Sequence, residues 1–241
     1  MDVQNTMPWN HLNLTELDVS CCYKMDDQFL NTLLSTTVSK LRYLRCAVDN
    51  EIIQNISEVN KPLRTLDLRR IEEIDIKEMT KFLSSCECLE ALDVSSIPMD
   101  YEDFKSLLPN LPRLRWLSIA GNDVRKQTFD IISQHNQHLK ELSINFYQSS
   151  VEDVDLLRNL ISSCQDLQKI CLQCANVKSV TSDIQKSFGN GRFVDFCKSS
   201  EFLFPSPQWS IKTFSERFAR QSAGLSDFSA RDERTGEKLA F

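Results

Sequence analysis

Two pairs of residues in this sequence have the types and the spacing that bind metal ions. Cys171 and Cys174 stand three positions apart, a spacing found in zinc sites and in thiol redox pairs. His135 and His138 also stand three apart, just before an apolar segment. A structural zinc site needs a second ligand pair, and a zinc protease needs a glutamate-bearing helix around its histidines. Neither accompanies these residues, so we predict no metal and no other cofactor.

Thiol chemistry is the other reaction that these residues could support. A nucleophilic thiolate at Cys171 or Cys174 needs a basic neighbourhood, and Lys169 alone is close to them in the sequence. The Gly189-Asn190-Gly191 segment lacks the strand and helix of a phosphate-binding loop and is more typical of the end of a helix. We therefore predict that the chain is not an enzyme and has no catalytic residue. A thiol enzyme remains the alternative that rapid labelling of either cysteine would favour.

A repeated leucine pattern organises most of the chain. The pattern Leu-x-x-Leu-x-apolar occurs seven times, at successive spacings of 27, 22, 26, 25, 25 and 28 residues. The copies are Leu14-Leu17-Val19, Leu41-Leu44-Cys46, Leu63-Leu66-Leu68, Leu89-Leu92-Val94, Leu114-Leu117-Ile119, Leu139-Leu142-Ile144 and Leu167-Ile170-Leu172. These spacings match the period of leucine-rich repeats.

Each repeat predicts one short strand and one helix. Apolar and polar residues alternate within Thr65-Leu66-Asp67-Leu68-Arg69, as in a strand with one buried face, and apolar residues between the strands follow helical spacing. Such repeats bury their apolar faces only by stacking on each other. We predict an α/β fold, a leucine-rich-repeat solenoid shaped as a curved horseshoe of about seven strand-helix repeats, with a parallel sheet on the concave face. The shortest repeat leaves Glu51 to Glu58 room for about two helical turns.

The period also predicts the domain organisation. Beyond the repeats, the aromatic residues Phe193, Phe196, Phe202 and Phe204 could cover the exposed end of the last repeat. An amphipathic helix over Ile211–Leu225, offered to a partner groove, is the alternative. We predict a lead-in over residues 1–11, a repeat domain over 12–189, a C-terminal cap or amphipathic segment over 190–230 and a disordered tail over 231–241.

Composition narrows the classes of partner. A net charge of −6 and the absence of a basic run argue against nucleic acid. No stretch is apolar for long enough to span a membrane, and the first thirty residues are unlike a signal peptide. Nine cysteines, an odd number spread through the repeats, fit reduced thiols in the cytoplasm or nucleus. We therefore expect a protein partner, with neither nucleic acid nor membrane.

Several phrases of the repeats resemble known families. Ser84-Ser85-Cys86-Glu87-Cys88-Leu89 and Ser162-Ser163-Cys164-Gln165-Asp166-Leu167, with Cys21-Cys22 after the first strand, resemble the cysteine-containing repeats of F-box leucine-rich proteins. Leu92-Asp93-Val94-Ser95-Ser96 and the long helical segments resemble the zygote-defective (Zyg/Zer) receptor family. The resemblance covers residues 12 to 188 and implies a substrate receptor of a cullin-RING ubiquitin ligase, with a cullin adaptor as a further partner.

A non-enzymatic leucine-rich-repeat scaffold or regulator unrelated to ubiquitin is the alternative function. The 13 residues before Leu14 are fewer than an F-box module occupies, and armadillo-like repeats are not evident after residue 190. Both observations favour the scaffold. The sequence does not identify the partner, because a repeat fold leaves specificity to its variable surface residues.

The candidate binding site follows from alternation along the predicted strands. Residues that flank the buried positions should point to the concave face, where a partner would bind. Arginine and large aromatic residues dominate interface energetics, so we select residues of these types together with neighbouring acids. The candidates are Tyr43, Arg45, Asp67, Arg69, Asp93 and Trp116. Two other roles are open: Trp116 could pack over a small neighbour such as Ala91, and the arginines could pair with Asp67 and Asp93 across adjacent strands.

Overall fold

A computed structural model of the chain describes twelve stretches of it. These are residues 14–21, 27–37, 41–45, 50–57, 62–68, 74–122, 124, 126–145, 151–173, 195–198, 227–232 and 238–240. The chain divides into two compact units, the first from Met1–Cys88 with Pro205–Phe241 and the second from Leu89–Phe204. The boundary therefore falls inside the segment for which the sequence predicts one repeat domain.

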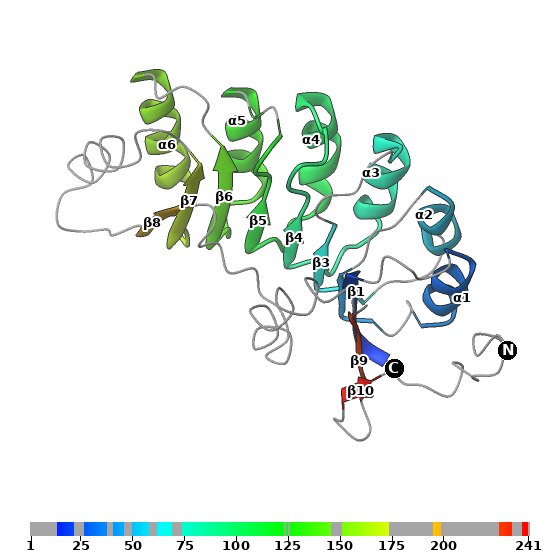
Figure 1. The fold of residues 1–241 in the computed structure, drawn as a ribbon. Helices are drawn as coiled ribbons and strands as arrows, with labels where there is room; N and C mark the ends of the chain where they lie inside the picture. The colour runs from blue at the N-terminus through cyan, green and yellow to red at the C-terminus, as the bar shows by residue number, and fades with distance from the viewer. Residues whose placement is uncertain are drawn as a thin grey trace, which may run out of the picture. The chain divides into compact units, whose positions relative to one another are not determined.

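The first unit contains three strand-helix repeats. Its elements in chain order are β1 (Leu14–Cys21), α1 (Asp27–Thr37), β2 (Tyr43–Arg45), α2 (Asn50–Ser57), β3 (Thr65–Asp67) and α3 (Ile76–Ser84). The strands pair in parallel in the order β1-β2-β3, and the three helices lie together on one side of them (Figure 1). As the sequence predicts, α2 has room for only about two turns, being 8 residues long.

Two further strands continue the sheet of the first unit beyond β1. β9 (Asp227–Asp232) pairs antiparallel with β1, with Ala230 opposite Leu17, and β10 (Lys238–Ala240) pairs antiparallel with β9. The described residues of segment 231–241, for which the sequence predicts a disordered tail, belong to these two strands. The physical reason is that β1 has a free edge whose N–H and C=O groups accept a partner strand of almost any composition.

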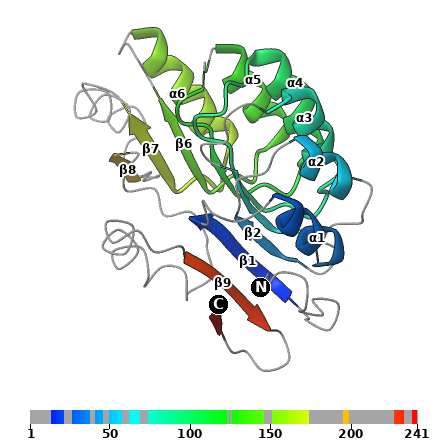
Figure 2. The same ribbon diagram turned by 45° about the vertical axis from the view of Figure 1, so that its right-hand side comes forward.

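The described residues of the second unit form three strand-helix repeats and two further strands. Its elements are β4 (Ala91–Asp93), α4 (Tyr101–Leu107), the 3₁₀ helix η3 (Leu108–Asn110), β5 (Trp116–Ser118), α5 (Lys126–His135), β6 (Glu141–Asn145), α6 (Val151–Ser163), β7 (Lys169–Gln173) and β8 (Asp195–Lys198). All five strands pair in parallel in the order β4-β5-β6-β7-β8. Figure 2 shows α4, α5 and α6 side by side against one face of these strands.

β8 is the described part of the segment that the sequence assigns to a C-terminal cap. It covers the free edge of β7, with Phe196 in register with Ile170. The remainder of residues 190–230, including the amphipathic alternative over Ile211–Leu225, lies outside the described residues except for the start of β9.

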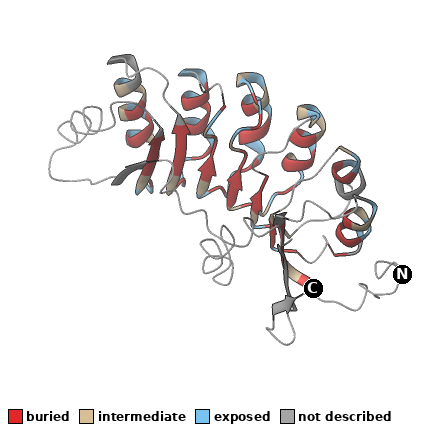
Figure 3. Ribbon diagram, in the orientation of Figure 1, coloured by how far each residue is buried: buried red, intermediate tan, exposed pale blue. Residues whose placement is uncertain are grey.

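Columns of leucine form the core of each unit. Leu17, Leu44 and Leu66 occupy matching positions on β1, β2 and β3, and each is almost completely buried. Leu117 and Leu142 stand in the same relation on β5 and β6. Burying one such side chain contributes roughly 1.5–3 kcal/mol, so the repeating leucines account for the stacking of the repeats. Figure 3 shows the buried residues on the strands and on the strand-facing sides of the helices.

Buried amides tie successive repeats of the second unit together. Asn122 donates through Nδ2 to the carbonyl oxygens of Val94 (3.0 Å) and Ile119 (3.1 Å), and its Oδ1 accepts from the Met99 amide at 3.0 Å. Near the ends of the helices, Asn136 Nδ2 donates to the carbonyl oxygen of Leu111 at 2.9 Å. These bonds give a side-chain partner to backbone groups that otherwise bond only within their turns.

The predicted α/β leucine-rich-repeat fold class is thereby confirmed. Among the described residues, seven strands that carry the leucine pattern are parallel within their units, and six α-helices alternate with them along the chain. No helix among the described residues is long and apolar enough to cross a membrane.

Candidate functional site on the strand faces

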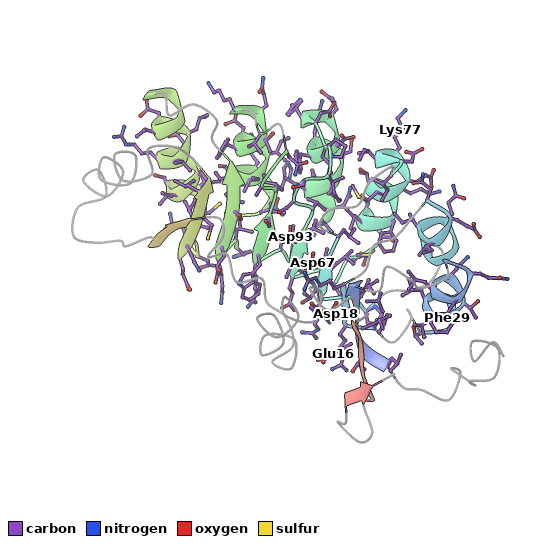
Figure 4. All side chains as sticks on the ribbon, viewed as in Figure 1. Glu16, Asp18, Phe29, Asp67, Lys77 and Asp93 are labelled. Atoms are coloured by element: carbon purple, nitrogen blue, oxygen red, sulfur yellow. The ribbon has the colours of Figure 1, made fainter. Side chains whose placement is uncertain are left out.

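The side of each unit's strands that faces away from the helices, here called the strand face, carries the predicted site residues. On the first unit, Asp18, Arg45 and Asp67 occupy one register position on β1, β2 and β3. Figure 4 shows Asp18 and Asp67 on this part of the molecule. Because the three residues alternate with the buried leucines, their side chains form a row across the sheet.

Arg45 joins the two acids of this row. Its Nε lies 2.9 Å from Asp67 Oδ2, and its Nη1 lies 3.8 Å from Asp18 Oδ2. The two carboxylates are 1% and 3% exposed, whereas the arginine side chain is 17% exposed. The sequence-based alternative that an arginine pairs with Asp67 is therefore confirmed for Arg45. The row is a buried ion-pair network whose main effect is to fix the relative positions of three strands.

The other predicted residues of the first unit contribute less accessible surface. Tyr43 is buried, at 4% exposure, between the register partners Glu16 and Thr65. A tyrosine so enclosed supports the sheet and offers little of its ring to a partner. Arg69 lies outside the described residues, so its place in the site stays a prediction.

Trp116 is the predicted residue that the structure leaves accessible on the second unit. It begins β5, half-buried, with Ala91 beside it on β4 and Glu141 beside it on β6. Ala91 is fully buried, as expected where a large ring stands next to a small side chain. Trp116 therefore packs beside Ala91, as the sequence-based alternative has it, and still leaves part of its ring open to solvent.

Two cations that the sequence analysis did not select stand next to Trp116. Lys140 Nζ lies 5.9 Å from the centroid of the indole ring, within the range of a cation–π interaction. Arg115 is exposed and occupies the position in its repeat that Lys140 occupies in the next repeat. The carbonyl oxygen of Arg115 accepts from the Lys140 amide at 2.7 Å. The signal was present in the sequence, because the two residues stand 25 positions apart, which is one repeat period. Arg115, Trp116 and Lys140 are called the Trp116 patch below.

Asp93, the last predicted residue, is buried at 1% exposure. Its Oδ1 accepts from the Ser95 amide at 2.9 Å, and Ser95 Oγ lies 2.6 Å from Ser118 Oγ on the next strand. These bonds hold the turn after β4 against β5. Asp93 therefore holds the backbone of the turn in place, and its buried carboxylate is not accessible to a partner in this conformation.

The residues considered for metal or thiol chemistry do not assemble into a site among the described parts of the chain. No group of three or more potential metal ligands occurs there. His138 is exposed and pairs with Asp166 at 3.1 Å, in agreement with a solvated loop. Cys171 is buried and disulfide-bonded, which corrects the expectation of uniformly reduced thiols and removes it as a free nucleophile. Cys174 and Gly189-Asn190-Gly191 lie outside the described residues.

The repeats, the leucine columns and the parallel strand faces define an α/β leucine-rich-repeat fold. Among solved structures, the chain is similar to LegL7, a leucine-rich repeat-containing protein from Legionella pneumophila, at 14% identity and a TM-score of 0.45 over 71% of this chain and 61% of that one. It is also similar to TLR13 in a complex with ssRNA13, at 17% identity and a TM-score of 0.41 over 61% of this chain and 23% of that one. The chain thus spans less than two thirds of the length of either protein. No protein-family model matches the sequence, and no curated protein sequence matches it.

Proposed function

We propose that this chain is a non-catalytic protein-interaction module that holds a protein partner on the strand face of its second unit. The observation that carries the proposal is Trp116, a large aromatic side chain that remains partly open on a regular parallel sheet. Tryptophan and arginine are the residue types that most often anchor protein interfaces, and here they are consecutive.

The rigidity of the surroundings supports a binding role. Trp116 stands on a strand that pairs on both sides, and the turns that flank the strands are fixed by buried hydrogen bonds. A side chain held on such a framework loses little conformational freedom when a partner binds, so more of its contact energy appears as affinity.

The finer proposal is that the bound protein is a substrate recruited to a cullin-RING ubiquitin ligase in the cytoplasm or nucleus. Its support is the sequence resemblance over residues 12 to 188. Under this proposal the strand face holds the substrate, and the cullin adaptor is contacted elsewhere. A scaffold unrelated to ubiquitin uses the same strand face without an adaptor.

Affinity purification of the tagged full chain from cells, followed by mass spectrometry, tests both the proposed interaction role and the proposed link to a ubiquitin ligase. The informative variant is Trp116→Ala. Tyr101→Ala is the matched control, because Tyr101 on α4 is also half-buried and also lies beside a lysine, with Lys105 Nζ 5.6 Å from its ring, but on the helical side of the unit.

The expected result is a set of proteins that Trp116→Ala loses and Tyr101→Ala keeps. Co-purification of a cullin and its adaptor would support the ligase proposal, with the lost proteins as candidate substrates. Partners without any cullin would leave the scaffold function. If both variants retain the same partners as the wild type, the strand face of the second unit is not the binding surface.

A further inference from the structure

We infer that the Trp116 patch binds an acidic peptide segment of its partner, with side-chain carboxylates at Arg115 and Lys140 and an apolar side chain against the indole ring. This inference rests on the proposed function and names the chemistry of the partner at that site. It is carried by two cations, Arg115 and Lys140, that stand beside Trp116 without an ion-pair partner among the described residues.

The charges of Arg115 and Lys140 have no acidic partner among the described residues. Two other cations of the second unit are neutralised locally: Lys105 lies 3.2 Å from Glu102, and Arg158 lies 2.6 Å from Asp155. Lys140 is instead directed to the face of Trp116. The two cations stand beside a partly accessible indole ring on a chain whose net charge is −6, and they are the complement of an acidic ligand.

The second unit has two described aromatic–cation pairs, and they differ in whether the lysine also has a carboxylate partner. Lys105 stands over Tyr101 at 5.6 Å and is bound to Glu102, so its charge is already satisfied. Lys140 stands over Trp116 at 5.9 Å and retains its charge for a ligand. The arrangement on the helical side is therefore complete in itself, whereas the arrangement on the strand face is open.

The geometry suits an extended segment rather than a single carboxylate. Arg115 and Lys140 immediately precede the neighbouring parallel strands β5 and β6, and Trp116, the first residue of β5, has Ala91 and Glu141 as its register partners. Strands in one sheet are about 4.8 Å apart, and side chains on one face of an extended peptide are about 6.6 Å apart, a difference that the long arginine and lysine side chains can span. Acidic residues on one face of such a peptide can therefore reach the two cations, while an apolar residue on the same face covers the ring.

The nearby acids argue for a peptide over a nucleic acid. Glu90 precedes β4 and Glu141 follows Trp116 in register on β6, so carboxylates border the patch on both sides. A continuous phosphate backbone would meet these carboxylates, and phosphate binding needs a basic stripe. A short acidic segment can place its charges at the two cations alone.

Fluorescence anisotropy of the full chain with labelled peptides tests the inference. The probe is fluorescein-Glu-Glu-Leu-Glu-Glu-Leu, compared with fluorescein-Lys-Lys-Leu-Lys-Lys-Leu and with a single-stranded oligothymidylate. The double variant Arg115→Glu with Lys140→Glu reverses the patch. Lys126→Glu is the matched charge reversal at the exposed first residue of α5, away from the strand face.

The expected result is binding of the acidic peptide that weakens by at least about tenfold in the double variant and stays unchanged in Lys126→Glu, with affinity falling as salt rises. In a chain carrying Trp9→Phe and Trp209→Phe, Trp116 is the sole tryptophan, and its emission should change on addition of the acidic peptide. Circular dichroism of every variant confirms that it folds.

Three outcomes would overturn the inference: equal binding of the basic peptide, unchanged binding by the folded double variant, or tighter binding of the oligothymidylate. Failure of this inference can be distinguished from failure of the proposed function. If the purified partners still depend on Trp116 while the acidic peptide does not bind, the interaction role stands with a partner of different chemistry. If the partners do not depend on Trp116 either, both proposals fail.

Discussion

The Nε atom of Arg45 on β2 lies 2.9 Å from Oδ2 of Asp67 on β3, and the carboxylate is almost completely buried. The same guanidinium reaches Asp18 on β1 at 3.8 Å. Removing the arginine would take one positive charge away from two enclosed carboxylates. Arg45→Met should therefore destabilise the first unit by about 3–5 kcal/mol, measured by urea denaturation.

The loss of stability in Arg45→Met should depend on Asp18 and Asp67 and not on the net charge of the chain. Arg115→Met removes an exposed arginine and should change stability by less than about 0.5 kcal/mol. Adding Asp18→Asn and Asp67→Asn to Arg45→Met should recover part of the loss, because the uncompensated charges are gone. A loss that the neutralising substitutions do not reduce would argue against the ion-pair network.

Asn122 is expected to be the most sensitive polar residue of the second unit. Its side chain makes three hydrogen bonds with backbone groups of two successive repeats, and it is 2% exposed. Asn122→Ala would remove three buried hydrogen bonds and leave the Met99 amide and the two carbonyl groups with only their turn bonds, at a cost of about 2–4 kcal/mol. Thermal unfolding measures this loss.

Asn110→Ala is the control for that substitution. Asn110 is exposed, and its Nδ2 donates to the Ser106 carbonyl oxygen at 2.7 Å on the surface. Water can replace this bond, so the expected loss is below about 1 kcal/mol. Similar losses in the two variants would contradict the bridging role of Asn122.

The repeat period explains why the strands and helices could be predicted from the sequence. Leu17, Leu44 and Leu66 recur at nearly constant spacing and form one buried column, so the local pattern and the packing agree. β8, β9 and β10 could not be predicted in this way. β9 pairs with β1, which is far away in the sequence, and no local periodicity marks such pairing. β8 follows β7 at about one repeat period and β10 follows β9 closely, but neither carries the leucine pattern.

The candidate site was predictable in residue type and less so in exposure. Alternation placed Asp67 and Asp93 on the strand faces, but their burial depends on Arg45 and on the turn at Ser95. Trp116 was found because it is a large aromatic residue at an alternating position. Lys140 was missed because its contact with Trp116 joins two repeats, and only the register of β5 and β6 brings them together.

Gly121 should not tolerate a side chain. Its φ of +86° is in the left-handed region, and an added Cβ would lie 2.9 Å from Ser96 Oγ and 3.1 Å from the Ser96 backbone nitrogen and Cα. Gly121→Ala should therefore cost about 1–3 kcal/mol, seen as a lower Tm. Ser96 itself has a φ of +64°, so Ser96→Gly, the comparison variant, should change stability by no more than about 1 kcal/mol. An unchanged Tm in Gly121→Ala would show that the two turns are not stacked in solution.

The pairing of β9 with β1 gives a prediction that separates the two units. Ala230 lies at the middle of the antiparallel pairing, opposite Leu17. Ala230→Pro places a residue without an N–H donor in a strand next to β1 and should open this edge of the sheet. Hydrogen exchange followed by mass spectrometry should show faster exchange in the peptide covering residues 14–21.

The peptide covering residues 141–145 is the internal control for this experiment. It lies on β6, which pairs with β5 and β7 inside the second unit, so its exchange should be the same in the wild type and in Ala230→Pro. Faster exchange in both peptides would mean that the two units unfold together. Unchanged exchange in both would mean that β1 does not rely on β9 for protection, because a paired edge strand loses protection when its partner is removed.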